Sequence, residues 1–257
     1  MDINLLALSV GNSRLAIGTF VSGELQHVTR VPHTQRADWP AIITQAWMPI
    51  AKRENAGVAA ASVNPPLVAP LKQAVSDATS HDIQWIGSDL DLPIKVRTKI
   101  PAETGIDRIL NMAAAYEQMS KGCVVVDAGT AVTIDCCNDA GEFLGGSISP
   151  GVNMQLDALH DKTAKLPRIT FAKPIGTFGD TTEQAILQGV YHGVRGLVKE
   201  MAENYATDLG YWPDIIATGG DSPALFEGWE LIHAIAPDLT LYGIALAYTE
   251  HHIKHNT

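Results

Sequence analysis

The sequence predicts an α/β protein built from two similar domains in tandem, and three observations lead to that fold class. The 257 residues, 46% of them hydrophobic and 18% charged, can form one large core or two cores of roughly 120 residues each. A pattern of short strands and tight turns occurs near the N-terminus and again 118 residues later. Alternating helical and strand patterns follow both copies, as expected for a duplicated α/β domain.

The first copy begins with the apolar residues 5–8, which a short polar turn separates from a second apolar run at 15–20. This arrangement is typical of a β-hairpin. Residues 22–24 form a second turn and residues 25–31 a third strand, which Pro32 ends because proline lacks the N–H group that a sheet requires. We therefore expect a meander of three antiparallel strands.

The second copy has the same order of strands and turns. Residues 124–126 predict a buried strand, 127–130 a tight turn, 131–137 a second strand, and 143–149 a third strand after a turn at 138–141. A shared offset at three turn positions is hard to obtain by chance, so it supports a duplication. The residues that align at this offset of 118 are Gly11 with Gly129, Gly23 with Gly141, and Glu24 with Glu142.

The rest of the chain fits the same plan. A helix that begins near Asp107 keeps an apolar face, and we expect it to act as the hinge between the two domains. We therefore expect domains at residues 1–112 and 113–257. The other expected helices are 38–51, 66–79, 181–209 and 241–255, and the other expected strands are 57–62, 83–86 and 214–218.

Composition and charge limit the classes of partner. Acidic residues outnumber basic ones, 28 to 18, so a net charge of -10 leaves no excess basic surface for a nucleic-acid backbone. The sequence has no apolar run long enough to span a membrane, and we expect a cytoplasmic protein. Cys123, Cys136 and Cys137 lack the CxxC spacing of metal and redox motifs, so we expect buried reduced thiols.

The common nucleotide-binding, zinc and serine-hydrolase motifs are absent, including the GxxxxGK(S/T) phosphate loop. If the protein binds phosphate, it must therefore use a different kind of phosphate-binding loop. The turns at Gly11 and Gly129 are candidates, because backbone N–H groups in such turns bind anions and glycine lets an anion approach closely. Each turn alone is more typical of an ordinary hairpin than of a phosphate site, but their repetition favours phosphate binding. Short side-chain donors follow the glycines: Asn12, Ser13, Thr130 and Thr133.

A second group of candidate residues lies in the segment 101–111. Asp107 and Arg108 are expected to open a helix, where an acidic residue is ordinary compensation of the helix dipole. Compensation of the helix dipole explains the acidic residue at 107, but it does not explain why a glycine stands at 105 or an arginine at 108. A carboxylate in this place could accept a proton from a substrate hydroxyl, while the guanidinium could bind a carboxylate or phosphate through two N–H groups. The spacing alone leaves both interpretations open.

Longer motifs around these residues resemble those of a known family. The strongest are G-I-D-R at 105–108 with Asn111 and Ala114 after it, V-D-A-G-T-A-V-T-I-D at 126–135, and G-G-S-I-S-P-G at 145–151. Supporting matches are T-A-K-L-P at 163–167, G-D-T-T-E-Q-A-I at 179–186 and T-G-G at 218–220. Over nearly its whole length the chain resembles the type III pantothenate kinases, of the superfamily that contains acetate kinase, sugar kinases, Hsp70 and actin.

The resemblance implies two tandem actin-like (ribonuclease H-like) domains with a nucleotide cleft between them. It implies ATP-dependent phosphorylation of the primary hydroxyl of pantothenate to 4'-phosphopantothenate, the first step of coenzyme A biosynthesis. It further implies a cytoplasmic homodimer that requires Mg²⁺ and a monovalent cation, K⁺ or NH₄⁺. No nucleic acid and no membrane is expected as a partner.

The resemblance also implies a role for each candidate residue by its position. Asp107 would be the general base, and Asp127 would hold the monovalent cation. The pantothenate-binding residues would be Gly105, Ile106, Arg108 and Thr182. The ATP-binding residues would be Ser9, Gly11, Asn12, Ser13, Arg14, Gly129, Thr130, Gly219 and Gly220.

Two positions depart from the family pattern. Ser9 stands where the family motif Asp-x-Gly-Asn-Thr has an aspartate directed at the metal and phosphates, so one negative charge is missing. Thr98 stands seven residues before Gly105, where many members have an aromatic residue that contacts pantothenate. The alternative function is a catalytically impaired homologue that acts as a regulatory or accessory protein and binds nucleotide or pantothenate. A kinase for another small hydroxy acid is a third possibility.

Overall fold

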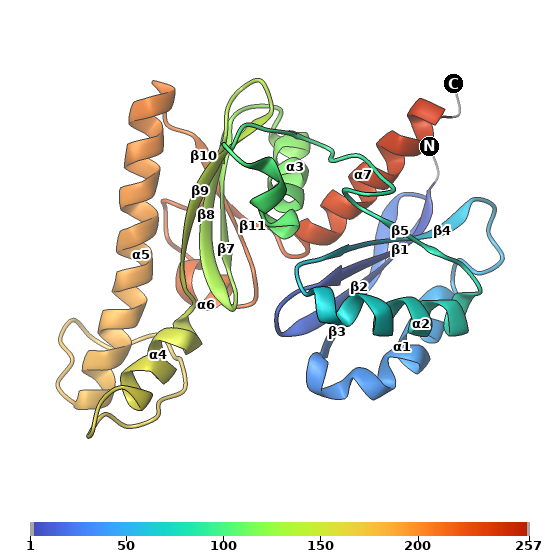
Figure 1. Cartoon of the computed structure of the whole chain (residues 1–257). Helices are drawn as coiled ribbons and strands as arrows, with labels where there is room; N and C mark the ends of the chain where they lie inside the picture. The colour runs from blue at the N-terminus through green and yellow to red at the C-terminus, as the bar shows by residue number, and fades with distance from the viewer. Residues whose placement is uncertain (1–2, 256–257) are drawn as a thin grey trace. The chain divides into compact units, whose positions relative to one another are not determined.

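The computed structural model describes residues 3–255, and its contacts divide the chain into two compact units. The first unit contains the chain up to Lys95, Lys99–Ala114 and the segment from Leu239 onward. The second unit contains Val96–Thr98 and Ala115–Asp238. Figure 1 shows that each unit is built on its own sheet, with helices packed against it.

The first unit contains a five-stranded mixed sheet of order β3-β2-β1-β4-β5. Strands β1 (Asn4–Val10), β2 (Arg14–Val21) and β3 (Glu24–Pro32) form the expected antiparallel meander. Strands β4 (Ala56–Ser62) and β5 (Ile83–Trp85) extend the sheet in parallel with β1. The carboxyl ends of β1, β4 and β5 therefore lie along one edge, which is where open α/β sheets bind ligands.

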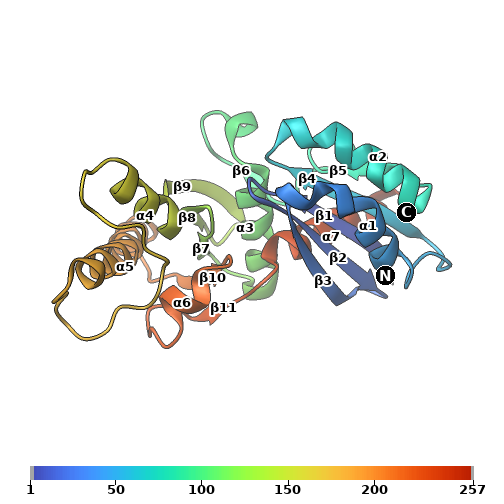
Figure 2. The ribbon, with the colours of Figure 1, turned by 90° about the horizontal axis from the view of Figure 1, so that it is seen from below.

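Helices pack against both faces of this sheet. They are α1 (Trp39–Trp47), α2 (Val68–Thr79), the first part of α3 (Ile106–Met119) and α7 (Leu239–His255), with short 3-10 helices η1 (His33–Asp38), η2 (Pro65–Leu67) and η3 (Pro101–Glu103). Helices α1 and α2 lie side by side (Figure 2) and share a core with Leu6 and Leu8 of β1. Leu5 and Ala7 point to the other face and pack with α7. This alternation follows from the two-residue period of a strand.

The second unit contains a six-stranded sheet of order β11-β10-β7-β8-β9-β6. Its meander consists of β7 (Cys123–Ala128), β8 (Ala131–Cys137) and β9 (Glu142–Pro150). The strands β10 (Asp214–Thr218) and β11 (Ala234–Ile235) run parallel to β7, and β6 (Lys95–Val96) lies at the β9 edge. One face packs in a core with α4 (Val152–Asp161), α5 (Thr182–Leu209) and α6 (Ser222–Phe226).

The expected duplication is confirmed by the topology of the two sheets. From β9 to β11 the second sheet has the same strand order and directions as the first sheet from β3 to β5. An irregularity in pairing is repeated as well. Gln26 is left out of the β2–β3 register and Leu144 out of the β8–β9 register, and these two residues are again 118 positions apart.

Two elements differ from the sequence-based expectations. The helix expected over 38–51 is shorter, because α1 ends at Trp47 and the chain continues in turns. Helix α7, expected within the domain 113–257, belongs to the first unit. It packs closely on α3, since a Cβ atom at Gly243 would lie only 2.3 Å from the carbonyl oxygen of Leu110. This return of the chain depends on long-range packing that no local pattern records.

The three cysteines are buried and form no disulfide, as expected. Cys123, Cys136 and Cys137 are free and buried, and burial raises the pKa of the Cys136 thiol to about 12. Cys136 therefore remains a protonated thiol at neutral pH. Over residues 3–255, no helix combines the length and apolar character needed to cross a membrane.

Candidate active site

The turn between β1 and β2 lies at the carboxyl end of β1 in the first unit. The backbone N–H of Gly11 donates to the carbonyl oxygen of Arg14 at 3.1 Å and closes the turn. Asn12, Ser13 and Arg14 are exposed, and Ser9 is half-buried on the strand before them. The turn thus presents short polar groups at the sheet edge that favours ligands.

His33 braces this turn and was missed by the sequence analysis. Its Nε2 atom lies 2.9 Å from the carbonyl oxygen of Gly11, and its backbone N–H donates to the carbonyl oxygen of Ser13 at 3.1 Å. Because a carbonyl oxygen only accepts, Nε2 must carry the proton. The Nδ1 atom is buried and has no hydrogen-bond partner in the described part of the chain. Nothing in the local sequence marks a contact between residues so far apart.

Asp107 lies in the first turn of α3, also in the first unit. Its Oδ1 atom accepts a hydrogen bond from the backbone N–H of Arg108 at 2.9 Å. Gly105 leaves room for the present position of this carboxylate, because a Cβ atom there would lie 2.7 Å from the same oxygen. Burial raises the pKa of the Asp107 carboxyl, and the hydrogen bond and charge of Arg108 oppose this only in part. A carboxylate with a raised pKa is well suited to accept a proton.

Helix α3 is anchored behind Asp107. Asn111 is almost fully buried, and its Oδ1 atom accepts a hydrogen bond from the Thr240 hydroxyl of α7 at 2.7 Å. The close approach at Gly243 holds α7 against the next residue of α3, Leu110. These contacts fix the first turn of α3, and with it Asp107, within the first unit. They also give Asn111, which follows the G-I-D-R motif, a structural role.

Asp127 is the central candidate of the second unit. It lies on β7 with Thr133 of β8 and Thr218 of β10 beside it in register. Two glycines lie close to its carboxylate. A Cβ atom at Gly219 would be 2.4 Å from Oδ1, and a Cβ atom at Gly129 would be 3.6 Å away. Glycine at 219 is therefore necessary for the present position of the Asp127 carboxylate.

Three loops meet at the turn between β7 and β8. The N–H of Gly151 donates to the carbonyl oxygen of Thr130 at 3.1 Å, and the N–H of Asp221 donates to that of Ala128 at 3.0 Å. A Cβ atom at Gly151 would lie 2.2 Å from the carbonyl oxygen of Gly129. The motifs at 145–151 and 218–220 thus both support this turn. Thr130 and Gly220 are exposed beside it.

Thr182 is the first residue of α5 and is exposed. The helix is capped by its neighbour Thr181, whose hydroxyl oxygen accepts a hydrogen bond from the N–H of Gln184 at 3.1 Å. The Thr182 hydroxyl is therefore not the one that caps the helix. Thr182 lies outside the three loops that meet near Asp127.

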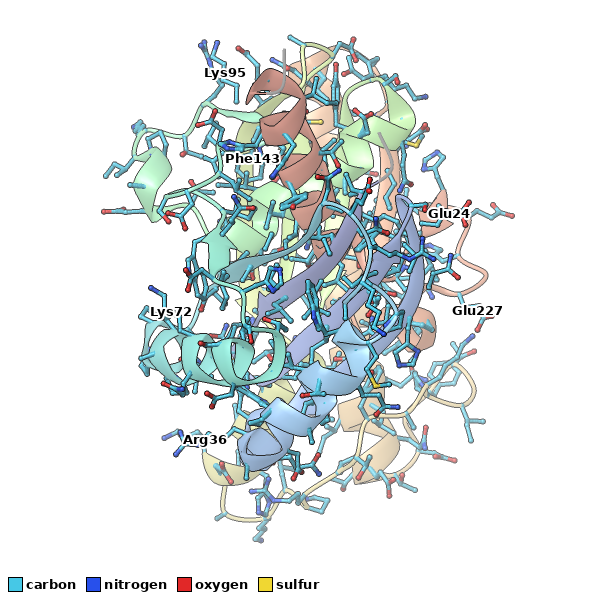
Figure 3. All side chains as sticks on the ribbon, turned by 90° about the vertical axis from the view of Figure 1, so that its right-hand side faces the viewer. Glu24, Arg36, Lys72, Lys95, Phe143 and Glu227 are labelled. Carbon is cyan, nitrogen blue, oxygen red and sulfur yellow. The ribbon has the colours of Figure 1, made fainter. Side chains whose placement is uncertain are left out.

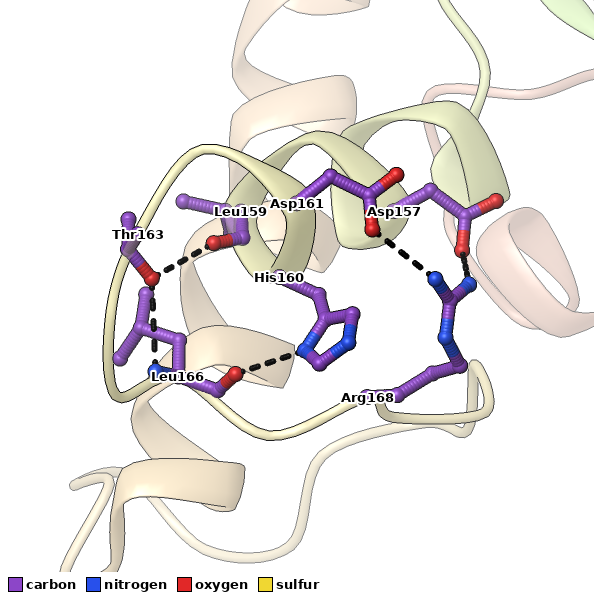
Figure 4. A network of polar contacts seen from close by, with 7 residues as sticks. All are labelled: Asp157, Leu159, His160, Asp161, Thr163, Leu166 and Arg168. Atoms are coloured by element: carbon purple, nitrogen blue, oxygen red, sulfur yellow. Dashed lines mark hydrogen bonds and ion pairs between the residues drawn. The ribbon is translucent and has the colours of Figure 1, made fainter.

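The segment before α5 is tied to α4 by polar contacts, which Figure 4 shows. Arg168 binds the carboxylates of Asp157 and Asp161, the second at 2.9 Å. The Nδ1 atom of His160 lies 2.8 Å from the carbonyl oxygen of Leu166. These contacts order the chain that leads from α4 towards Thr182. Arg168 was not marked by any motif.

The two units together define a class of protein. Two tandem copies of one sheet, each with a glycine turn after its first strand, form the two-domain fold of the actin-like ATPases. MreB 5 of Spiroplasma citri bound to AMPPNP has this fold, with a TM-score of 0.52 and 12% identity over 100% of this chain and 98% of that one. A Baf family transcriptional activator from Campylobacter jejuni has a TM-score of 0.60 and 23% identity over 98% of this chain and 100% of that one.

Sequence comparison gives the particular family. The model of the type III pantothenate kinase family matches residues 5–204. A type III pantothenate kinase of Solibacter usitatus is 34% identical over 253 residues, which cover 96% of this chain and 97% of the relative. The chain belongs to the type III pantothenate kinase family.

Proposed function

We propose that this protein transfers the γ-phosphoryl group of ATP to the primary hydroxyl of pantothenate, giving 4'-phosphopantothenate in the first step of coenzyme A biosynthesis. Family membership and the partly buried carboxylate of Asp107 beside Gly105 support this proposal. A coupled assay of ATP consumption with pantothenate, Mg²⁺ and either potassium or sodium tests it. ATP consumption that does not depend on pantothenate would contradict it.

In the proposed mechanism Asp107 is the general base. Its carboxylate accepts the proton of the pantothenate hydroxyl as the oxygen bonds to the γ-phosphorus and the bond to the ADP oxygen breaks. The raised pKa brings this base closer to the working pH, which favours proton transfer. Gly105, Ile106, Arg108 and Thr182 are the proposed pantothenate-binding residues.

The proposed ATP-binding residues belong to glycine-containing loops at strand ends. Such loops suit phosphate because their backbone N–H groups can point at an anion. His33 and Gly151 would keep two of the turns in shape. The residues are Ser9, Gly11, Asn12, Ser13 and Arg14 of the first unit, and Gly129, Thr130, Gly219 and Gly220 of the second.

The residues present fit Mg²⁺ held mainly by nucleotide phosphates. Among residues 3–255 there is no group of three or more His, Cys, Asp or Glu side chains suited to a metal. Mg²⁺ in kinases commonly takes one or two carboxylates together with phosphates and water, so such a group is not required. When bound, Mg²⁺ neutralises charge on the phosphates. Asp127 is the proposed ligand of the monovalent cation, K⁺ or NH₄⁺, because its carboxylate is an oxygen donor kept uncrowded by Gly219.

We expect Asp127→Asn to raise KM for ATP about tenfold and to remove the dependence on potassium, because one charge-assisted contact contributes about 1.5–3 kcal/mol. Initial rates in potassium, ammonium, sodium and choline salts measure this. Asp77→Asn, at an exposed carboxylate of α2, is the matched control and should behave like the native protein. Equal native activity in potassium, sodium and choline would contradict the cation role.

We expect Ser9→Asp to lower KM for Mg²⁺-ATP or to raise kcat, because it restores the charge missing from the first turn. The neighbours of Ser9 in register are Ala16 of β2 and Ala61 of β4, so an aspartate has room. Steady-state kinetics at varied Mg²⁺ measure the effect. An active native protein that the substitution leaves unchanged would show that this charge is not needed. A native protein and a variant that are both inactive would instead favour the accessory-protein function.

We further propose a cytoplasmic homodimer. Apolar side chains are exposed on α4 and on the chain before α5, and Figure 1 shows these segments at one end of the second unit. Ile175 is 78% exposed and Phe178 is 84% exposed on the chain before α5, and Met154 and Leu159 of α4 are exposed as well. Exposed apolar groups in one region are typical of protein–protein contacts. A second copy of the chain on this surface would also bring its own groups close to Thr182.

A further inference from the structure

A pair of thiols in the second unit has no role in the proposed phosphoryl transfer. Val124 of β7 pairs in register with Cys136 of β8. The next residues outward, Cys123 and Cys137, therefore stand opposite each other, at the first position of β7 and the last position of β8. Their Sγ atoms lie 3.7 Å apart, close enough for one thiol to donate a hydrogen bond to the other. Two thiols in direct contact can form a disulfide, which a single buried thiol cannot do.

The two thiols lie on the face of the sheet opposite the core that contains α5. Cys136 packs in that core, and side chains alternate along a strand, so Cys137 points to the other face. Phe143 of β9, labelled in Figure 3, pairs in register with Cys137 and is fully buried. Asp214 of β10 pairs in register with Cys123. Because a neighbouring strand lies on each side, the contact between the thiols is inside the sheet and not at its edge.

The two thiols differ in acidity. The hydrogen bond from the Cys123 thiol lowers the pKa of Cys137 below its ordinary value of 9.0, although burial opposes this effect. The same hydrogen bond raises the pKa of Cys123, since ionisation would remove the donor, and burial raises it further. Cys137 is therefore the thiol that ionises first, and the thiolate is the form that reacts with oxidants. Cys136 has no such partner for ionisation, because its thiol donates to the carbonyl oxygen of Cys137 at 3.6 Å.

We propose that Cys123 and Cys137 form a reversible oxidation site, which hydrogen peroxide converts to a disulfide. The Cys137 thiolate attacks one oxygen of the peroxide and the O–O bond breaks. The hydroxide that leaves takes up the proton lost by Cys137, giving a sulfenic acid and water. The Cys123 sulfur then attacks the sulfur of the sulfenic acid, the S–O bond breaks, and the hydroxyl group leaves as water with the Cys123 proton. The two thiols lose two electrons and two protons, and the peroxide is reduced to two water molecules.

The geometry permits both closure of the bond and access to it. A disulfide has an S–S distance of about 2.05 Å, so the sulfur atoms must approach by about 1.7 Å through side-chain rotation and a small shift of the strand ends. Cys123 and Cys137 are buried, but each is two residues from an exposed residue, Lys121 or Asp139. Strand ends open locally more readily than strand centres, and hydrogen peroxide is small and uncharged. The bond would close the β7–β8 hairpin at the end opposite its Gly129 turn.

Treatment of the folded native protein with hydrogen peroxide, followed by thiol titration and peptide mapping, tests this assignment. The protein should lose two of its three titratable thiols without gaining oxygen, and the map should contain a disulfide between Cys123 and Cys137. Dithiothreitol should restore all three thiols. Because the bond closes a loop of about 15 residues, Tm should rise by about 5–10 °C on oxidation. Cys136→Ala, at the neighbouring buried cysteine, is the matched control and should form the same disulfide.

Removal of one thiol tests the order of the two steps. In Cys123→Ala the sulfenic acid of Cys137 has no second thiol to react with, so peroxide should add oxygen to Cys137 and form no disulfide. Three intact thiols after prolonged treatment of the folded native protein would overturn the proposal, as would a disulfide that involves Cys136 or joins two copies of the chain. The map of the native protein decides this even if a substitution in the sheet prevents folding. None of these measurements depends on ATP or pantothenate, so the proposed function is tested separately.

Discussion

Asp107→Asn is expected to lower kcat for pantothenate phosphorylation by about 10²- to 10⁴-fold, because the amide has the shape of the carboxylate but cannot take the hydroxyl proton. Its oxygen can still accept the N–H of Arg108, so the first turn of α3 should persist. Binding of ATP should change little. Single-turnover rates and calorimetric ATP binding, measured on the same preparations, separate the chemical step from binding.

The stability of this variant provides the control. Burial disfavours the charged form of Asp107, so its pKa in the folded protein lies above the ordinary value of 3.8. The stability contributed by the protonated group is full below the ordinary pKa and is lost as the pH rises through the raised pKa. At pH 7 the neutral asparagine should therefore be at least as stable as the native residue, which thermal unfolding measures. Near-native turnover would show that Asp107 only compensates the helix dipole.

The meanders and their glycine turns were predictable because their signals are local. Strand periodicity and turn residues lie within some thirty positions, and the second copy repeats them. The place of α7 was not predictable in the same way. The helix itself has a clear pattern, but its partner Leu110 is far away in sequence, and the only local sign of the close approach is the absence of a side chain at Gly243.

Some residues of the candidate site were likewise predictable from local motifs, and others were not. Asp107, Arg108 and Asp127 could be selected because they lie in recognisable motifs, and their roles remain predictions. The close approach of the Asp107 carboxylate to Gly105 became clear only from the distance between them. His33 was missed because a single histidine after a strand has no distinctive pattern, although it holds the β1–β2 turn through Gly11.

Gly219→Ala is expected to destabilise the protein by about 2–5 kcal/mol, since two unfavourable effects combine at this position. Gly219 has φ of +92°, which an alanine adopts only with strain. The new Cβ atom would also lie 2.3 Å from the carbonyl oxygen of Ala128 and 2.4 Å from the Asp127 carboxylate. Because backbone cannot move aside cheaply, the carboxylate and the β7–β8 turn should be displaced, and ATP binding should weaken more than tenfold. Thermal unfolding and calorimetric ATP titration measure the two effects.

Gly210→Ala is a control that separates backbone strain from the steric contacts that a Cβ atom would make at position 219. Gly210 ends α5 with φ of +80°, close to that of Gly219, but a Cβ atom there would meet nothing within 4 Å. Strain alone should then cost about 1–2 kcal/mol and leave ATP binding at the native value. If Gly219→Ala lost no more stability than Gly210→Ala and bound ATP normally, the space beside Asp127 would have no functional importance. A larger loss confined to Gly219→Ala would instead connect the T-G-G motif with the position of the Asp127 carboxylate.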